Sequence, residues 1–326
     1  MDTFTAMQSA DETEMEQVAD TAPEVSEPPW PTGEVRLVPC DACGHESFQP
    51  LFHKQSSREE LFRVVRCEHC GLVQVNPQPD AAAVAPYYGD SYFERRTDRG
   101  YDNYYSEELK AQINRVYAMN LRDLGFEKFE SEALFRGLET ATALDVGCAA
   151  GYFVEFMADR AWDSRGIELA EGPALYAREH MGLNVTTGDF LTHASLEPGS
   201  FDLVTLWASI EHMHSPRRVL ERTHELLRPG GRMLLSTCRY GVLAKARGAA
   251  WRYMNVPEHL YFFSLPGLKA LAHDTGFAVE ASITYGSGMT MRPGAGPLFR
   301  TLKRIADPAV KRLNQGDMMA LHLRKV

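Results

Sequence analysis

Residues 142–236 alternate between short apolar segments and amphipathic ones, and this alternation constrains the fold more than any other feature of the chain. Strands are predicted at 142–146, 164–168, 183–187, 201–207 and 232–236, with helices at 152–161 and 216–227. Parallel strands need long crossover connections, which are usually helical. The pattern therefore predicts an α/β fold with a parallel sheet, whose ligand crevice lies at the carboxyl ends of the strands.

A glycine-containing turn, Gly147-Cys148-Ala149-Ala150-Gly151, joins the first predicted strand to the first predicted helix. A turn of this kind lets a ligand approach backbone N–H groups closely. By itself the turn would suit any doubly wound fold, including a dinucleotide-binding enzyme. The G-x-G-x-x-G form that is usual in dinucleotide enzymes is absent from this turn.

Acidic side chains follow the next two predicted strands. Glu168 ends the second strand, seventeen residues after Gly151, and Asp189 follows the third, next to Phe190. A carboxylate at the first position can accept hydrogen bonds from both ribose hydroxyls of a nucleoside. An acid at the second can accept from the amino group of adenine. The spacing therefore predicts a nucleoside site along the sheet edge.

As a set, ALDVGCAAG, the strand ending at Glu168, GDF, FDLVTLWASIEHMHSP and LLRPGGRMLLST resemble the successive motifs of class I S-adenosylmethionine-dependent methyltransferases. The resemblance covers about residues 141–326. It implies a Rossmann-like, mostly parallel sheet of seven strands, S-adenosylmethionine as cofactor and methyltransferase activity. One departure is Ala149, where the family more often has a second glycine.

Carried over motif by motif, the resemblance implies distinct roles around the cofactor. Asp145, Gly147 and Gly151 would surround the methionine end, Glu168 would hold the ribose, and Trp207 would lie near the sulfonium. The complete set of implied cofactor contacts is Asp145, Gly147, Cys148, Ala149, Gly151, Glu168, Leu169, Asp189, Phe190 and Trp207.

Two identical cysteine units, Cys40-x-x-Cys43-Gly44 and Cys67-x-x-Cys70-Gly71, lie 23 residues apart. Each pair of thiolates can hold one side of a tetrahedral zinc ion, and two pairs complete a four-cysteine structural site. Disulfides are the competing interpretation, but no export signal is readable. We therefore predict a zinc-ribbon unit over residues 35–80.

Charge is distributed unevenly along the 326 residues. Residues 1–34 contain nine acids and no Lys or Arg, whereas the chain as a whole has a net charge of −10. This composition predicts a disordered acidic tail and a nearly neutral body. No stretch approaches the roughly eighteen apolar residues of a membrane-spanning helix, and no secretory signal is visible, which predicts a cytoplasmic protein without a transmembrane segment.

Two Glu-His pairs are candidates for activating the methyl acceptor. Glu211-His212 follows the fourth predicted strand, and Glu258-His259 lies in an aromatic segment after the fifth. Histidine is the readiest general base at neutral pH. We expect His259, oriented by Glu258 or a nearby tyrosine, to be the base, with His212 as the alternative.

The N-terminal half is similar to bacterial methyltransferases of sugar-nucleotide and cell-surface polysaccharide pathways. The shared features are the paired cysteine units, the NPQPD turn and YYGDSYF. In the sugar C-methyltransferases among them, a Glu-His pair before an aromatic-Phe-Ser stretch carries the base, which matches Glu258 and His259. The tyrosine that they place before this pair is replaced here by Val256 and Pro257. The resemblance thus implies a small-molecule acceptor, with O- and C-methylation both open.

The remaining segments divide the chain further. Residues 81–135 are predicted to form a helical, aromatic-rich cap whose main helix spans 107–129. Residues 136–326 are predicted to form the cofactor-binding domain. Tyr92 and Tyr104 are the candidates for a lid. Residues 296–313 are predicted to form one or two amphipathic helices that lie between the last two strands in the chain. These helices either pack against the rest of the protein or contact an anionic membrane surface.

Two further functions compete with the small-molecule enzyme. An RNA methyltransferase could grip its substrate with the zinc ribbon, but residues 36–80 hold five basic and six acidic residues, so no nucleic acid partner is predicted. A non-catalytic sensor of the cofactor would share the same binding motifs, and an assay for methyl transfer separates it from an enzyme.

Overall fold

The computed structural model describes residues 35–88, 93, 103–135, 140–289 and 296–326. The predicted acidic tail, residues 1–34, lies outside the described residues, as do parts of the predicted cap and Tyr92.

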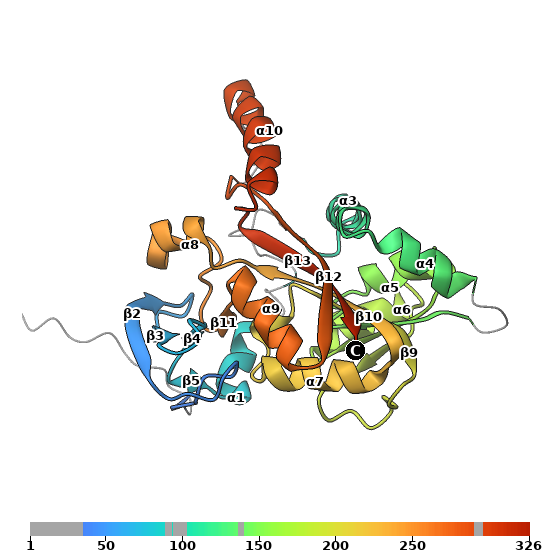
Figure 1. The fold of residues 1–326 in the computed structure, drawn as a ribbon, viewed down its shortest axis with the longest axis horizontal. Helices are drawn as coiled ribbons and strands as arrows, with labels where there is room; N and C mark the ends of the chain where they lie inside the picture. The colour runs from blue at the N-terminus through green and yellow to red at the C-terminus, as the bar shows by residue number, and fades with distance from the viewer. Residues whose placement is uncertain (1–34, 89–92, 94–102, 136–139, 290–295) are drawn as a thin grey trace, which may run out of the picture.

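A seven-stranded sheet forms the centre of the fold (Figure 1). Its strand order is β12-β13-β10-β9-β6-β7-β8, and only β13 runs antiparallel to its neighbours. The strands are β6 (Thr142–Val146), β7 (Asp163–Glu168), β8 (Val185–Thr187), β9 (Phe201–Trp207), β10 (Leu227–Cys238), β12 (Phe277–Tyr285) and β13 (Met318–Lys325). The predicted mostly parallel, seven-stranded α/β fold is confirmed.

Helices cover both faces of this sheet. One face packs against α3 (Glu107–Asp123), α4 (Phe126–Leu134) and α5 (Tyr152–Ala158). The other packs against α7 (Pro216–Leu226) and α9 (Leu265–Asp274), while α6 (Glu171–Glu179) lies beside β7 and β8.

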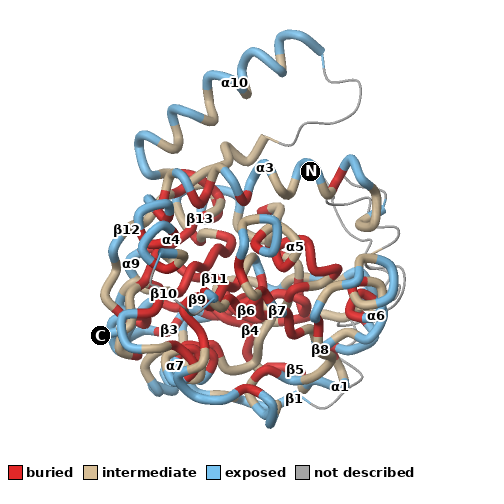
Figure 2. Tube along the Cα trace, turned by 90° about the vertical axis from the view of Figure 1, so that its right-hand side faces the viewer, coloured by how far each residue is buried: buried red, intermediate tan, exposed pale blue. Residues whose placement is uncertain are grey.

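Successive residues of the central strands point to opposite faces, which explains their continuous apolar sequence. Leu203 and Leu234 join the cluster beneath α3–α5, whereas their neighbours Val204 and Leu235 join the cluster beneath α7 and α9. Strands buried on both faces are typical of parallel sheets. Figure 2 shows these strands as the buried interior of the molecule.

Element boundaries differ from prediction mainly where the chain turns. The predicted helix 107–129 is two helices, because the chain turns at Leu124 and Gly125 between α3 and α4. The strand predicted at 232–236 begins earlier, at Leu227, since β10 includes an irregular register around Arg228–Gly231.

The N-terminal unit is a small antiparallel sheet that the rest of the chain completes. Its own strands are β2 (Phe48–Gln55), β3 (Leu61–Cys67) and β4 (Val73–Val75), and β1 (Val35–Arg36) pairs separately with β5 (Gln78–Pro79). The fourth strand of the sheet is β11 (Tyr261–Phe262), which pairs antiparallel with β4. One hydrophobic cluster therefore runs from Phe62 and Val64 to the central sheet.

Short elements connect these parts. They are α1 (Ala81–Val84), the 3-10 turns η1 (Ala85–Tyr88), η3 (Ile210–His212) and η4 (Gly248–Ala250), and α8 (Val242–Arg247). The longer α10 (Pro297–Arg312) lies between β12 and β13, as the sequence predicted for this region. Within the described ranges, no helix combines the length and apolar character needed to cross a bilayer.

Candidate active site

The strand order reverses between β6 and β9, which is the point where parallel folds of this kind place their ligand crevice. Parallel folds open at such a point because successive connections leave it in opposite directions. The two turns that border it, 147–151 after β6 and 208–212 after β9, contact each other directly. Gly147 has φ +70°, and a Cβ there would lie 2.8 Å from Cβ of Ser209. Any larger residue at 147 would push the two turns apart.

Ala149 and Glu168 tie the first turn to the neighbouring strand. The backbone N–H of Ala149 donates to Oε2 of Glu168 at 2.9 Å, and that of Ala170 donates to Oε1 at 2.8 Å. Both carboxylate oxygens are thus fixed at the end of β7 and retain lone pairs for further donors. Ala149 adopts φ +47°, a left-handed conformation that explains why glycine is more usual at this position.

Asp145 lies beneath the turn rather than on the surface. Its Oδ1 accepts a hydrogen bond from Oγ1 of Thr205 at 2.6 Å, and the residue is buried. Burial, with a smaller contribution from Glu168, raises the pKa of Asp145 to about 8. A cationic ligand in the crevice would favour the charged form of this carboxyl group.

The other implied cofactor residues differ in exposure. Asp189 is exposed, with Oδ1 accepting from the N–H of Leu191 at 2.8 Å, and Leu169 is 71% exposed. Phe190 and Cys148 are instead buried in hydrophobic clusters. Their side chains therefore support the strand ends, whereas Asp189 and Leu169 are the ones a ligand can reach.

Trp207 ends β9 at the crevice. Its ring packs against Tyr117 and Phe153, with centroids 5.3 and 5.1 Å away. Its indole Nε1 is buried and has no hydrogen-bond partner among the described residues. A buried donor of this kind is costly unless a ligand pairs with it.

The two candidate histidines are in contact. The rings of His212 and His259 lie 4.6 Å apart and nearly perpendicular, although 46 residues separate them. Backbone carbonyls orient both rings: Nδ1 of His212 lies 2.8 Å from the oxygen of Glu258, and Nδ1 of His259 lies 2.9 Å from that of Tyr253. Because each Nδ1 faces an acceptor, the tautomer with a basic Nε2 is favoured in both rings.

Two glutamates lie beside this pair of rings. Glu258 contributes its backbone carbonyl to His212. The carboxylate that joins the cluster is that of Glu211, which is buried and has an oxygen within 4.8 Å of a ring nitrogen of each histidine. A carboxylate here would stabilise a protonated histidine, and the three groups together also have the donor set of a divalent metal site.

Tyr88 is a site residue that sequence reasoning passed over in favour of Tyr92 and Tyr104. Its hydroxyl lies 2.8 Å from Nδ1 of His212 and donates to the carbonyl of Glu258 at 3.1 Å. Tyr104 instead stacks on Tyr152 at 5.3 Å, on the α5 side of the fold. The position of Tyr88 in an aromatic run carried no signal that distinguished it from its neighbours.

A family model described as a methyltransferase domain matches residues 106–282, more than half of the chain. The chain belongs to this methyltransferase family. It is an S-adenosylmethionine-dependent methyltransferase, as its motifs predicted.

Several relatives of this methyltransferase share one name. It is 39% identical to the "Ubiquinone biosynthesis O-methyltransferase" of Pseudomonas paraeruginosa over 169 residues, which are 48% of this chain and 71% of that protein. The enzyme of the same name from Pectobacterium carotovorum is 30% identical over 135 residues, 40% of this chain and 55% of that enzyme. Among solved structures, a SAM-dependent methyltransferase from Archaeoglobus fulgidus is 17% identical, with a TM-score of 0.46 and coverage of 67% and 94%.

The four cysteines of the methyltransferase converge as the spacing predicted. Sγ atoms of Cys40 and Cys70 lie 3.4 Å apart, those of Cys43 and Cys67 3.6 Å apart, and all four fall within 4.8 Å of one another. Tetrahedral zinc with Zn–S bonds of about 2.3 Å would place its sulfurs about 3.8 Å apart, so the group fits zinc. Burial raises the pKa of Cys70 to about 11, and a bound cation would be needed to keep such a thiol ionised.

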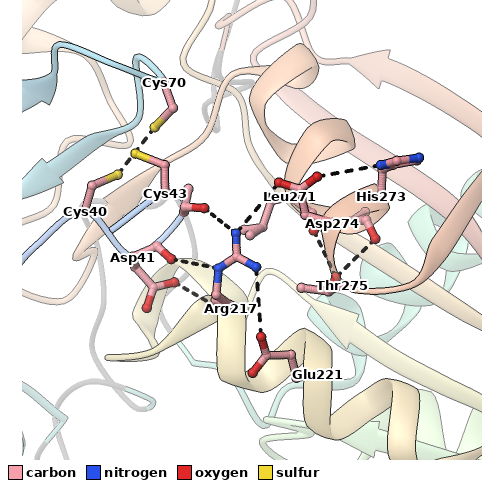
Figure 3. Close-up of polar contacts among 12 residues, drawn as sticks. Cys40, Asp41, Cys43, Cys70, Arg217, Glu221, Leu271, His273, Asp274 and Thr275 are labelled. Carbon is pink, nitrogen blue, oxygen red and sulfur yellow. Dashed lines mark hydrogen bonds and ion pairs between the residues drawn. The ribbon is translucent and has the colours of Figure 1, made fainter. Parts of the chain in front are cut away.

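Arg217 fastens the first cysteine unit to the start of α7 (Figure 3). Its backbone N–H donates to the carboxylate of Asp41 at 2.7 Å. Asp41 therefore caps the N-terminus of α7, although it lies far from this helix in the sequence. The guanidinium group donates to the backbone oxygens of Asp41 and Ala42. It also lies 3.9 Å from Glu221 and 3.8 Å from Asp274, so the cysteine unit is held to both α7 and α9.

Backbone hydrogen bonds connect the cysteine unit to the histidines. Val75 in β4 donates to the carbonyl of Leu260 at 2.9 Å, and Leu260 donates to the carbonyl of Glu211 at 2.9 Å. His259 therefore directly precedes an anchored residue, Leu260, and lies two residues before the strand that completes the N-terminal sheet. The small sheet positions the histidine segment.

Proposed function

We propose that this enzyme methylates a hydroxyl oxygen of a small molecule, with His259 as general base and the ten cofactor residues named above around S-adenosylmethionine. The observation that carries the proposal is the contact of His212 and His259 beside the buried Glu211, at the carboxyl end of β9. The names of the relatives, which are O-methyltransferases, favour oxygen over carbon as the methylated atom.

The proposed reaction needs positioning and one proton transfer. S-adenosylmethionine supplies an electrophilic methyl group on a positively charged sulfur. Nε2 of His259 takes the proton of the acceptor hydroxyl, while the carbonyl of Tyr253 holds the opposite ring nitrogen. The nearby Glu211 carboxylate stabilises the imidazolium that results. Residues such as Gly147 and Glu168 would hold the cofactor so that its methyl group faces the acceptor oxygen. The O–C bond would form as the C–S bond breaks, with S-adenosylhomocysteine as the leaving group.

The acceptor class is open to a direct experiment. The purified enzyme would be incubated with methyl-labelled S-adenosylmethionine and two sets of small hydroxyl compounds, phenols and sugar nucleotides, with RNA offered in a separate incubation. The products would be analysed by mass spectrometry. We expect label on an oxygen of one set. Label on carbon would favour the sugar C-methyltransferase resemblance, label on RNA would contradict the proposal, and cofactor binding without transfer to any acceptor would indicate a sensor.

Glu168→Ala is expected to weaken S-adenosylmethionine binding by roughly ten- to a hundredfold. The reason is that hydrogen bonds to a charged acceptor contribute about 1.5–3 kcal/mol, and the Glu168 carboxylate is held ready at the end of β7. Titration calorimetry measures the affinity. Glu179→Ala, an exposed acid at the end of α6, is the control and should bind as the wild type does. Equal affinities in the two variants would mean that the ribose site lies elsewhere.

A further inference from the structure

Helix α10 stands away from the rest of the molecule. In Figure 1 it projects from the end of the sheet, between β12 and β13, and in Figure 2 most of its length is exposed. None of its residues is buried. A helix of sixteen residues without a buried face is unusual in a globular domain, because tertiary packing supplies most of the stability of a helix.

The exposed side of α10 is apolar. Leu298, Leu302 and Ile305 follow one another at helical spacing, so they share one face, and their exposures are 73%, 51% and 64%. Leu313, directly after the helix, is 69% exposed. Single exposed leucines are ordinary, but a continuous exposed row indicates an interaction surface.

Polar contacts fix this orientation. Asp307 accepts from the backbone N–H of Ser287 at 3.1 Å and pairs with Lys303 at 2.7 Å. Lys311 pairs with Asp123 of α3. Phe299 and Val310 are also less exposed than the leucines, so the helix faces the body on the side that carries Asp307 and Lys311. Its row of Leu298, Leu302 and Ile305 lies on the exposed side.

Charge indicates what covers the row. Residues 297–312 contain five basic residues and one acid, and Arg300, Arg304 and Arg312 are exposed beside the leucines. Apolar residues flanked by arginines suit the interface of an anionic bilayer, where the apolar row enters the acyl boundary and the arginines reach the headgroups. A second copy of this helix would suit the row less well, since pairing two such faces would bring like charges together.

We propose that α10 binds the surface of an anionic lipid membrane through Leu298, Leu302 and Ile305. This inference is independent of the acceptor and of the chemistry proposed above. It assigns a function to a helix that none of the cofactor, zinc or histidine contacts uses.

The test is sedimentation of the full chain with lipid vesicles. The protein should sediment with vesicles containing phosphatidylglycerol, weakly or not at all with pure phosphatidylcholine, and less as salt rises. The double variant Leu302→Glu, Ile305→Glu should lose at least about tenfold in partitioning, because two apolar side chains no longer enter the interface. Arg300→Gln with Arg304→Gln should lose about fivefold for each charge removed.

Phe135→Glu is the matched control, since Phe135 is 87% exposed at the end of α4, away from α10. It should sediment as the wild type does, and circular dichroism and melting curves should be the same for all variants. Equal binding by the wild type and the Leu302→Glu, Ile305→Glu variant would overturn the proposal, as would sedimentation with neither vesicle. A dimer in light scattering that this variant dissociates would assign the row to a second copy instead.

Discussion

His259→Ala is expected to lower turnover by about 10²- to 10⁴-fold while leaving the affinity for S-adenosylmethionine nearly unchanged. The variant removes the nitrogen proposed to take the proton of the acceptor, whereas the residues proposed to hold the adenosine end, such as Glu168 and Asp189, lie at other strand ends. Turnover would be measured with the acceptor found in the labelled-methyl screen, and affinity by calorimetry. A matching loss of cofactor affinity would mean that His259 acts on binding or folding rather than on the proton.

His212→Ala separates the two histidines. Since the rings touch, the losses should not add, and the double variant should be no slower than His259→Ala alone. His212→Ala by itself should be the milder single change, because the base role is assigned to His259. If His212→Ala is the damaging variant, the base lies on the turn after β9. If neither matters, alignment alone carries the reaction.

Metal analysis distinguishes a base from a ligand in the same cluster. Glu211, His212 and His259 have the donor atoms of a divalent metal site, so the wild type and His259→Ala should be compared for metal content. If His259 is a general base, the wild type and His259→Ala should each contain one zinc per chain, bound at the cysteines. A second equivalent that disappears in His259→Ala would make His259 a ligand and contradict its assignment as the base.

Cys67→Ser is expected to reduce zinc content from one per chain toward zero and to lower the melting temperature by several degrees. The binding energy of a structural metal site is also folding energy, so losing a thiolate removes both. Turnover should fall as well, because β11, which completes the sheet of the cysteine unit, begins two residues after His259. This second effect distinguishes a unit that positions the active site from one that only adds stability.

His69→Ala is the control for the cysteine variant. His69 lies two residues from Cys67 and stacks on the exposed ring of His45, with centroids 3.8 Å apart, while all four thiolates remain. Zinc content, melting temperature and turnover should stay at wild-type values. A metal-free protein that melts and turns over like the zinc-containing one would refute the structural zinc site.

The amino-acid sequence by itself determined five strands of the central sheet, β6 to β10, and the carboxyl ends of the first four of them. Alternating apolar segments, the turn at 147–151, Glu168 at a strand end and the paired cysteine spacing are all local patterns. Each depends on neighbours a few residues apart, so period and spacing are sufficient to read them. Strand β6 and strand β9 accordingly have the predicted bounds.

Only the tertiary structure decided which distant residues meet. Tyr88 reaches His212 across 124 residues, His212 meets His259 across 47, and β11 joins a sheet whose other strands end at Val75. The outward row of α10 depends on Asp123 and Ser287, which hold the opposite side of the helix to the body. No periodicity encodes such pairings, because they result from how the sheet, the cysteine unit and the loops pack together once each has formed.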